Sequence, residues 1–171
     1  MAQYGQALNT WRALLHRPEI FEAYFPYLRA VVGPGTVSGR TKDLAAITVA
    51  IANRCRYSAS HRVRSGAANG IQPAELDALA AGRLDGFNAQ ERLAIRYARE
   101  LTLAPSRTPF ADNPQSVDPD LLAELTDAFD EPQIVELTAS IALWNALTRF
   151  HRVMDLPLDM PAPPPAIEAV L

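Results

Sequence analysis

The sequence predicts an all-α fold. Apolar residues recur at helical spacing between Pro and Gly residues, and no segment shows the strict alternation that is typical of a β-strand. The apolar run from Leu44 to Ala52 contains β-branched residues, but its alanines favour a helix and no partner strand is evident elsewhere in the sequence. We therefore expect about six to eight helices in a single domain at residues 1–155, followed by a Pro-rich tail at residues 156–171.

The limits of the predicted helices are set by Pro, Gly and capping residues. The second helix ends at Gly33-Pro34-Gly35, and we expect it to bend or break near Pro26. Asn88, with Glu91 three residues later, predicts a capping box. The expected helices cover approximately residues 9–16, 19–32, 41–54, 58–68, 73–80, 88–103, 118–129 and 131–154.

Two segments are predicted to lack helix. Prolines 105, 109, 114 and 119 mark a loop of about 14 residues, long enough to act as a lid or an interface arm. Five prolines between Leu156 and Pro165 exclude a helix, so we expect the tail to be extended and to lie along a neighbouring surface.

Composition narrows the class of protein. Of the 171 residues, 49% are hydrophobic and 20% are charged, which indicates a packed globular core. The 16 Lys and Arg residues against 19 Asp and Glu residues give a net charge of −3, and without a basic stripe we expect no nucleic-acid partner. A single cysteine excludes an intrachain disulfide and a multi-cysteine zinc site, and favours a reducing compartment.

The sequence predicts no membrane partner, cofactor or metal. The N-terminal residues lack a secretory pattern and the longest apolar run has about nine residues, so we expect a cytoplasmic protein. His16 and His151 are isolated from other ligand residues along the sequence. Gly33-Pro34-Gly35 lacks the strand-loop-helix context of a phosphate-binding loop.

The first candidate reactive residue is Cys55. The predicted buried helix delivers this cysteine to the start of the next helix, where the helix dipole favours a thiolate. Arg54, Arg56 and Arg62 would add to that effect if they face the thiol. The alternative is that Cys55 is a small buried hydrophobic residue.

These residues resemble the carboxymuconolactone decarboxylase and alkylhydroperoxidase-D-like (AhpD-like) family. That family's pattern is an acidic residue, eleven intervening residues, and then Cys-x-x-Cys-x-x-x-His. Asp43 occupies the acidic position, Cys55 the first cysteine, and Asn69-Gly70 the end of the helix that follows. The resemblance spans most of residues 24–157 and implies an AhpD-like helical fold that assembles into homotrimers or hexamers.

Three of the four motif positions differ from the family pattern. Ser58 replaces the second cysteine, so the family's Cys-x-x-Cys disulfide cannot form. Arg62 stands at the histidine position, with His61 one residue earlier, and Asp43 replaces the usual Glu. If the family's packing is kept, Asp43 and Arg62 form a salt bridge.

Each candidate residue has a functional and a structural interpretation. Arg62 is able to hold a substrate carboxylate but not to act as a base at neutral pH. His61 is either a general acid or base, or a surface or interface histidine. Ser58 contributes to the substrate site or only caps its helix, with no base evident to activate it. Tyr57 donates to an oxyanion or only packs.

We therefore expect an enzyme in which Cys55, Asp43 and His61 are catalytic and Arg62, Tyr57 and Ser58 bind a small-molecule substrate. The leading hypothesis is acid/base chemistry, a decarboxylation or isomerisation, on a small carboxylated or lactone-type compound. One alternative is a one-cysteine peroxidase, a peroxiredoxin-like oxidoreductase that uses Cys55. Another is a non-catalytic scaffold or ligand-binding protein.

Overall fold

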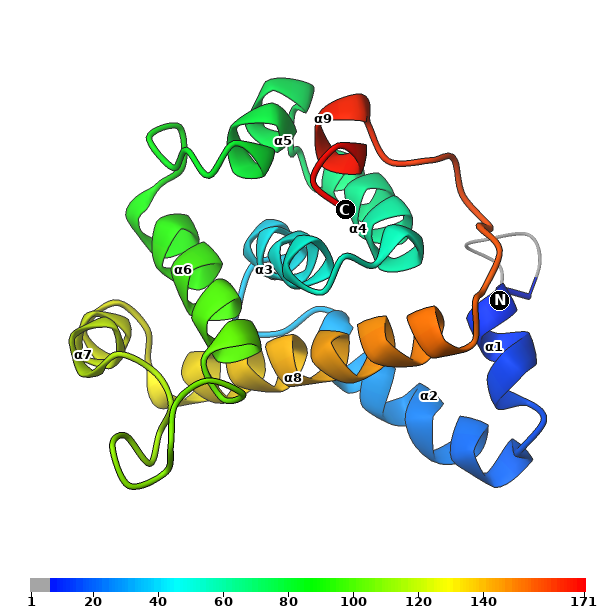
Figure 1. The fold of residues 1–171 in the computed structure, drawn as a ribbon, viewed down its shortest axis with the longest axis horizontal. Coiled ribbons are helices and arrows are strands. Elements are labelled where there is room, and N and C mark those ends of the chain that lie inside the picture. The colour runs from blue at the N-terminus through cyan, green and yellow to red at the C-terminus, as the bar shows by residue number, and fades with distance from the viewer. Residues whose placement is uncertain (1–6) are drawn as a thin grey trace.

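A computed structural model describes residues 7–171, which form nine α-helices and no β-strand. The all-α prediction is confirmed. Figure 1 shows the arrangement of these helices. Their bounds are α1 Asn9–Leu14, α2 Pro18–Val32, α3 Gly39–Ala52, α4 Arg56–Ala68, α5 Pro73–Ala80, α6 Ala89–Leu103, α7 Pro119–Ala128, α8 Glu131–Val153 and α9 Pro165–Glu168. Within the described part of the chain, no helix combines the length and apolar character that a bilayer span requires.

Helix α3 lies at the centre of the molecule, with α4, α6 and α8 packed around it (Figure 1). Ten consecutive residues of α3, from Thr41 to Ala50, are buried, as its continuous apolar run predicts. One face of α3 packs with α6, α7 and α8 around residues such as Ile141. The opposite face packs with α4, α5 and α9 around residues such as Ile71. The core is therefore divided into two clusters by one buried helix.

Side chains cap the starts of helices α3, α6, α7 and α8. Asn88 accepts a hydrogen bond from the backbone N–H of Glu91 and the Glu91 side chain accepts one in return, which confirms the predicted capping box. Asp130 and Gln133 form a second capping box at α8, and Asp118 caps α7 by accepting hydrogen bonds from the backbone N–H groups of Asp120 and Leu121. The predicted role of Ser58 as an N-cap is wrong, because α4 begins at Arg56, two residues earlier than expected, and Cys55 is its N-cap residue.

Helix α2 runs without a break from Pro18 to Val32, with Pro26 inside it, so the predicted break at that residue is not found. The connection from α2 to α3 is held by Glu136 of α8. The Glu136 carboxylate accepts hydrogen bonds from the backbone N–H groups of Thr36 and Val37, and from the ammonium group of the buried Lys42 at 2.5 Å. This contact fixes α2 beside the start of α8.

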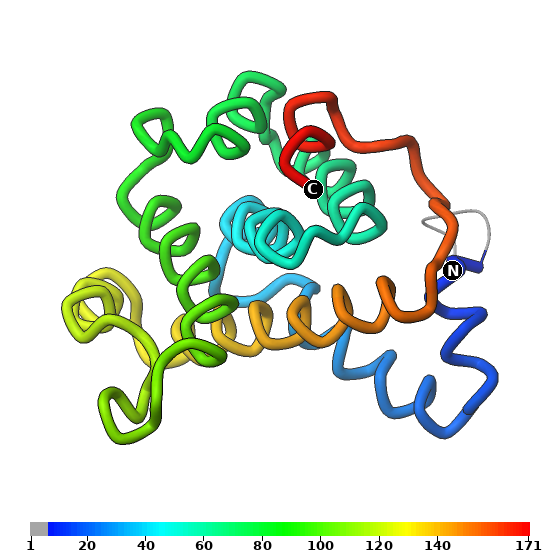
Figure 2. Tube along the Cα trace, in the orientation of Figure 1, coloured from blue at the N-terminus to red at the C-terminus, as the bar shows by residue number. Residues whose placement is uncertain are grey.

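The C-terminal segment folds back over its own chain. After α8, residues 154–164 form no helix and run past the start of α1 to the far side of α4, as the tube in Figure 2 shows. The predicted surface for the tail is therefore within the same chain. Helix α9 was not expected, and it begins at Pro165 because Pro is favoured at the first helical position. Ile167 of α9 is fully buried in the cluster formed with α4 and α5.

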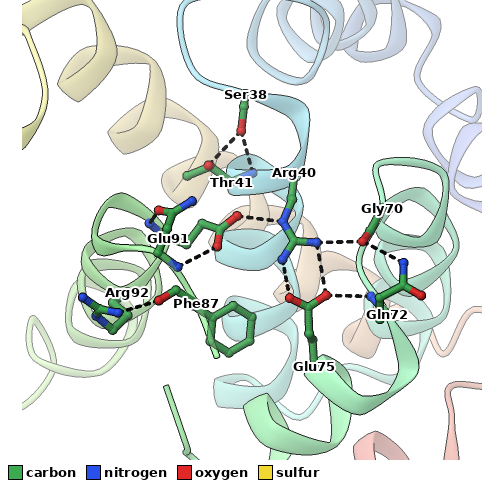
Figure 3. A network of polar contacts seen from close by, with 10 residues as sticks. Ser38, Arg40, Thr41, Gly70, Gln72, Glu75, Phe87, Glu91 and Arg92 are labelled. Atoms are coloured by element: carbon green, nitrogen blue, oxygen red, sulfur yellow. Dashed lines mark hydrogen bonds and ion pairs between the residues drawn. The ribbon is translucent and has the colours of Figure 1, made fainter. Parts of the chain in front are cut away.

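A partly buried arginine, Arg40 of α3, links α3 to α5 and α6 (Figure 3). Arg40 donates to Glu91 of α6 at 2.7 Å, to the carbonyl of Gly70 at 2.8 Å and to Glu75 of α5. The hydrogen bonds from Arg40 lower the pKa of Glu75 below its ordinary value. Glu91 is only 7% exposed, so its charge depends on Arg40 rather than on water.

Replacing Arg40 with Met is expected to destabilise the protein by about 2 kcal/mol, because it leaves the buried Glu91 carboxylate without its cationic partner. The measurement is the free energy of unfolding from urea titrations. Arg17→Met is the matched control, because Arg17 pairs with Glu19 in an ion pair whose side chains are 68% and 60% exposed. That control should change the free energy by about 0.5 kcal/mol or less. Equal losses in the two variants would contradict the expectation.

Candidate active site

A cavity of about 910 Å³ lies between α1 and α2 on one side and α4 and α8 on the other. One part of its wall is apolar and aromatic, and the other part is polar. Among the described residues that line it, none is Asp or Glu. The lining includes Trp11, Tyr24, Phe25, Leu28, Trp144 and Leu147 on the apolar side, and Arg29, Tyr57, Ser58, His61, Arg62 and His151 on the polar side.

Helix α4 supplies most of the polar wall. His61 and Arg62 are adjacent in sequence, yet both line the cavity, with exposed fractions of 8% and 6%. The cavity therefore extends far enough around α4 for both side chains to reach it, although they leave the helix in different directions. His61 is therefore not a surface histidine, and the structure brings it together with Tyr57, Ser58 and Arg62.

The predicted salt bridge between Asp43 and Arg62 is present. Arg62 Nη1 donates to Asp43 Oδ1 at 3.0 Å. The other carboxylate oxygen of Asp43 accepts hydrogen bonds from Ser65 Oγ at 2.8 Å and Asn69 Nδ2 at 2.7 Å. Asp43 is buried and does not line the cavity, so it acts on a cavity ligand only through its partners Arg62, Ser65 and Asn69, all of which line the cavity.

Arg62 also contacts the aromatic wall. Its guanidinium carbon lies 4.5 Å from the centroid of the Trp144 ring, within the range of a cation–π interaction. Its Nε atom is buried and has no hydrogen-bond partner in the described part of the chain. Arg62 is therefore held on one edge by Asp43 and on its face by Trp144.

Tyr57 connects the two histidines of the site. Its ring stacks on His61 with a centroid distance of 4.5 Å and lies against His151 at the same distance. Its hydroxyl donates to Asp159 of the C-terminal segment and accepts from the backbone N–H of Thr10 at 3.1 Å. Burial and the hydrogen bond to Asp159 raise the pKa of Tyr57 above its ordinary value.

A chain of side-chain contacts runs from Cys55 through the polar wall. Cys55 Sγ donates to Ser58 Oγ at 3.3 Å, and Ser58 Oγ lies 2.9 Å from His151 Nδ1. His151 Nε2 lies 3.0 Å from Thr10 Oγ1. The expectation that no base stands beside Ser58 is therefore wrong, because His151, which is isolated from other ligand residues along the sequence, lies next to Ser58 in the fold.

Cys55 itself is removed from the cavity. It is the N-cap residue of α4, is 1% exposed and does not line the cavity. The neighbouring arginines are directed elsewhere. Arg54 is exposed, Arg56 pairs with Glu168 of α9, and Arg62 pairs with Asp43.

Both histidines of the site are neutral at pH 7. Burial is the main cause that lowers the pKa of His61 to about 4, with Arg62 lowering it further and Asp159 opposing the change. Burial also lowers the pKa of His151 to about 3, with a contribution from His61. A neutral imidazole has one nitrogen that accepts a proton and one that donates it. Within residues 7–171 no group of three or more His, Cys, Asp or Glu side chains is placed to hold a metal ion.

Sequence reasoning missed His151 and Asp159. His151 is 93 residues from Ser58, and Asp159 is 102 residues from Tyr57. The only sequence signal for His151 is its place in a helix whose preceding residues, including Trp144, form an apolar face. Asp159 has no such signal, because it lies in a Pro-rich segment without periodicity.

Comparison with known proteins agrees with this fold. Residues 18–100 match the model of the Carboxymuconolactone decarboxylase family. This segment, just under half of the chain, is therefore similar to the carboxymuconolactone decarboxylase family, as the resemblance in the sequence predicts. It is also 37% identical over 71 residues to the uncharacterized protein YnjA of Escherichia coli, a match that spans 42% of this chain and 34% of that relative. The matched segment is thus about a third of that relative's length.

Several solved structures share the fold at 18–19% sequence identity. The debrominase Bmp8, solved in complex with 2,3,4-tribromopyrrole, matches with a TM-score of 0.76 over 98% of this chain and 82% of that chain. An alkylhydroperoxidase AhpD core from Ralstonia eutropha matches with the same score and coverage. A putative antioxidant defence protein AhpD from Agrobacterium tumefaciens matches with a TM-score of 0.71 over 85% of this chain and 94% of that chain.

The buried position of Cys55 predicts a slow thiol. We expect it to react with maleimide or stoichiometric peroxide about 100-fold more slowly than an exposed thiol, because reaction requires a local opening of roughly 3 kcal/mol. A Ser106→Cys variant supplies the exposed thiol within the same molecule, since Ser106 lies in the exposed loop before α7. Intact-mass analysis over time follows both reactions. Rapid oxidation that is lost in Cys55→Ser would contradict this expectation and favour a peroxidase.

Proposed function

We propose that this protein is an enzyme that transfers protons on a small carboxylated substrate, in a decarboxylation or isomerisation. One observation carries the proposal: a neutral imidazole and two arginines, Arg29 and Arg62, share a cavity wall that contains no Asp or Glu among its described residues. A fixed positive charge next to an aromatic wall suits a ligand with an anionic group and a flat apolar body.

His61 is the proton-transfer group in this proposal. Its neutral ring is able to accept a proton at pH 7 without first losing one. In an isomerisation, the imidazole takes a proton from one carbon of the substrate and returns it to another, so no net proton is consumed. In a decarboxylation, the bond to the carboxyl carbon breaks, CO₂ leaves, and the remaining electron pair takes a proton from a water molecule oriented by the imidazole, while the hydroxide that is left combines with CO₂ as bicarbonate.

Arg62 and Tyr57 are proposed to orient the substrate. Arg62 is fixed by Asp43 and Trp144, so its cation does not have to reorganise when an anion enters the cavity. The hydroxyl of Tyr57 is already engaged with Asp159, so Tyr57 contributes its ring rather than a free donor. Asp43 acts by holding Arg62, and Ser58 completes the polar wall.

The two alternatives have less support. A one-cysteine peroxidase needs peroxide to reach Cys55, which is 1% exposed and does not line the cavity. A non-catalytic ligand-binding protein is compatible with the three altered motif positions, but it gives no role to a neutral His61 beside a fixed cation. The debrominase complex supports a small ring as the class of ligand, since that protein of the same fold was solved with a tribrominated pyrrole.

Self-association is also proposed, as the family resemblance implies a homotrimer or hexamer. The outer face of α2 supports it, because Ile20 and Tyr27 are large apolar residues that are 48% and 47% exposed.

The anion site is tested by ligand binding. Both tryptophans of the chain, Trp11 and Trp144, line the cavity, so intrinsic fluorescence reports directly on its occupation. Benzoate is expected to bind more tightly than the neutral benzamide. Arg62→Lys, which keeps a charge beside Asp43, should weaken benzoate binding about 10-fold through loss of the planar fork. Arg149→Gln, on an exposed part of α8, is the control. Equal affinity for the two compounds would overturn the anion site.

The proton-transfer role is tested by turnover. A panel of small aromatic and lactone carboxylic acids is incubated with the protein in D₂O, and proton NMR detects both product and deuterium incorporation. For any acid that is turned over, His61→Asn should lower kcat by roughly 10²–10⁴-fold. His16→Asn is the matched control, because His16 is exposed and does not line the cavity. Wild-type turnover in His61→Asn would reject the proposed mechanism.

A further inference from the structure

The C-terminal segment places one buried carboxylate behind the candidate site. Asp159 lies between α8 and α9, and its side chain is only 3% exposed. Both of its oxygens accept from the backbone N–H of Asn9, at 3.1 and 3.0 Å, and one of them also accepts from the Tyr57 hydroxyl. This carboxylate therefore joins the tail, the start of α1 and the middle of α4.

Neighbouring contacts hold the segment in this position. Asn9 Nδ2 donates to the carbonyl of Pro157 at 3.0 Å, and Ser60 Oγ of α4 donates to the carbonyl of Pro161 at 2.9 Å. Asp159 thus lies between two further attachments of the segment, one to α1 and one to α4. A carboxylate fixed in this way has little freedom to turn.

His61 meets Asp159 through its Nε2 atom. Nε2 lies 3.5 Å from Asp159 Oδ2, within ion-pair distance, but the geometry does not form a hydrogen bond. The atom is fully buried and has no hydrogen-bond partner in the described part of the chain. A proton on Nε2 is stabilised by the negative charge of Asp159, whereas a lone pair on Nε2 would be repelled by that charge.

We infer that Asp159 is a positioning residue for His61: it fixes the ring through Tyr57 and keeps the imidazole proton on Nε2, so that Nδ1 is the nitrogen that exchanges protons with substrate. This inference rests on the proposed role of His61 in proton transfer. Nε2 is enclosed and cannot meet a ligand, which leaves Nδ1 for that exchange. A carboxylate behind a catalytic histidine selects the tautomer in the same physical way in serine proteases.

Other charged and titratable groups around His61 do not provide this selection. Arg62 and Arg64 lie on the same helix and are positive, so they disfavour a charged imidazole. His151 of α8 is neutral at pH 7, and its two nitrogens are occupied by Ser58 and Thr10. The hydroxyl of Tyr57 donates to Asp159 rather than to His61. Asp159, in the C-terminal segment, is therefore the anion that favours a proton on Nε2 of His61.

The test is the tautomer of His61 at pH 7, read from imidazole ¹⁵N chemical shifts of the full chain. The chain contains three histidines, so assignment by single substitutions is direct. In the wild type we expect the Nε2–H form to exceed the Nδ1–H form at least 10-fold. In Asp159→Asn the ratio should fall 10-fold or more, because the side-chain amide lacks the charge and is able to donate to Nε2. Asp155→Asn, an exposed position in the same segment, is the matched control and should leave the ratio unchanged.

A wild-type tautomer ratio in Asp159→Asn would overturn the inference. If that variant does not fold, Tyr57→Phe carries the test, because it frees Oδ2 of Asp159 and should keep His61 wholly in the Nε2–H form. A mixture of tautomers in Tyr57→Phe would then overturn the inference.

For a substrate that is turned over, Asp159→Asn should lower kcat with KM within about twofold of wild type. The tautomer readout does not require turnover, so it separates a failure of this inference from a failure of the proposed function, which appears as full activity in His61→Asn.

Discussion

The ion pair between Asp43 of α3 and Arg62 of α4 is the contact on which the rest of the site depends. Both residues are buried, so removing either partner would leave a charge without water or counter-ion. Ser65 and Asn69 satisfy the remaining carboxylate oxygen, and the two side chains come from the later turns and the end of α4. The pair therefore fixes α4 against the central helix. It also fixes the cation of Arg62 over Trp144, at the wall of the cavity.

The side chains of helix α4 point in two directions, which separates the thiol of Cys55 from the proton-transfer and anion-binding groups at the cavity. Cys55, at the N-cap, is directed into the protein and donates to Ser58. Tyr57 and His61 are four residues apart, so they stack on the same face, and that face meets the cavity together with Arg62. The thiol is thus enclosed by the same helix that exposes an imidazole and a guanidinium to the cavity. This separation is the structural reason for favouring proton transfer over thiol chemistry.

Features that depend on local sequence could be predicted, and features that depend on long-range contacts could not. The continuous apolar run predicts a buried α3, and the Asn88 capping box predicts the start of α6. The pairing of Asp43 with Arg62 follows from the family's packing. In contrast, His151 reaches Ser58 across 93 residues, and Asp159 lies in a segment whose prolines give no periodicity from which to infer its direction. Such contacts are set by how the helices and the tail pack, which one sequence does not specify locally.

The proposed chemistry depends on which group of the substrate Arg62 holds. An interaction accelerates a reaction only if it is stronger in the transition state than in the ground state. A carboxylate that leaves as CO₂ loses its negative charge, so an arginine bound to that carboxylate would oppose decarboxylation. In an isomerisation, charge develops on a carbonyl oxygen after His61 removes a proton, and a fixed cation stabilises it. Decarboxylation at this site therefore requires the departing carboxylate to lie away from Arg62, against the aromatic wall of Trp11 and Phe25, where poor solvation favours loss of charge.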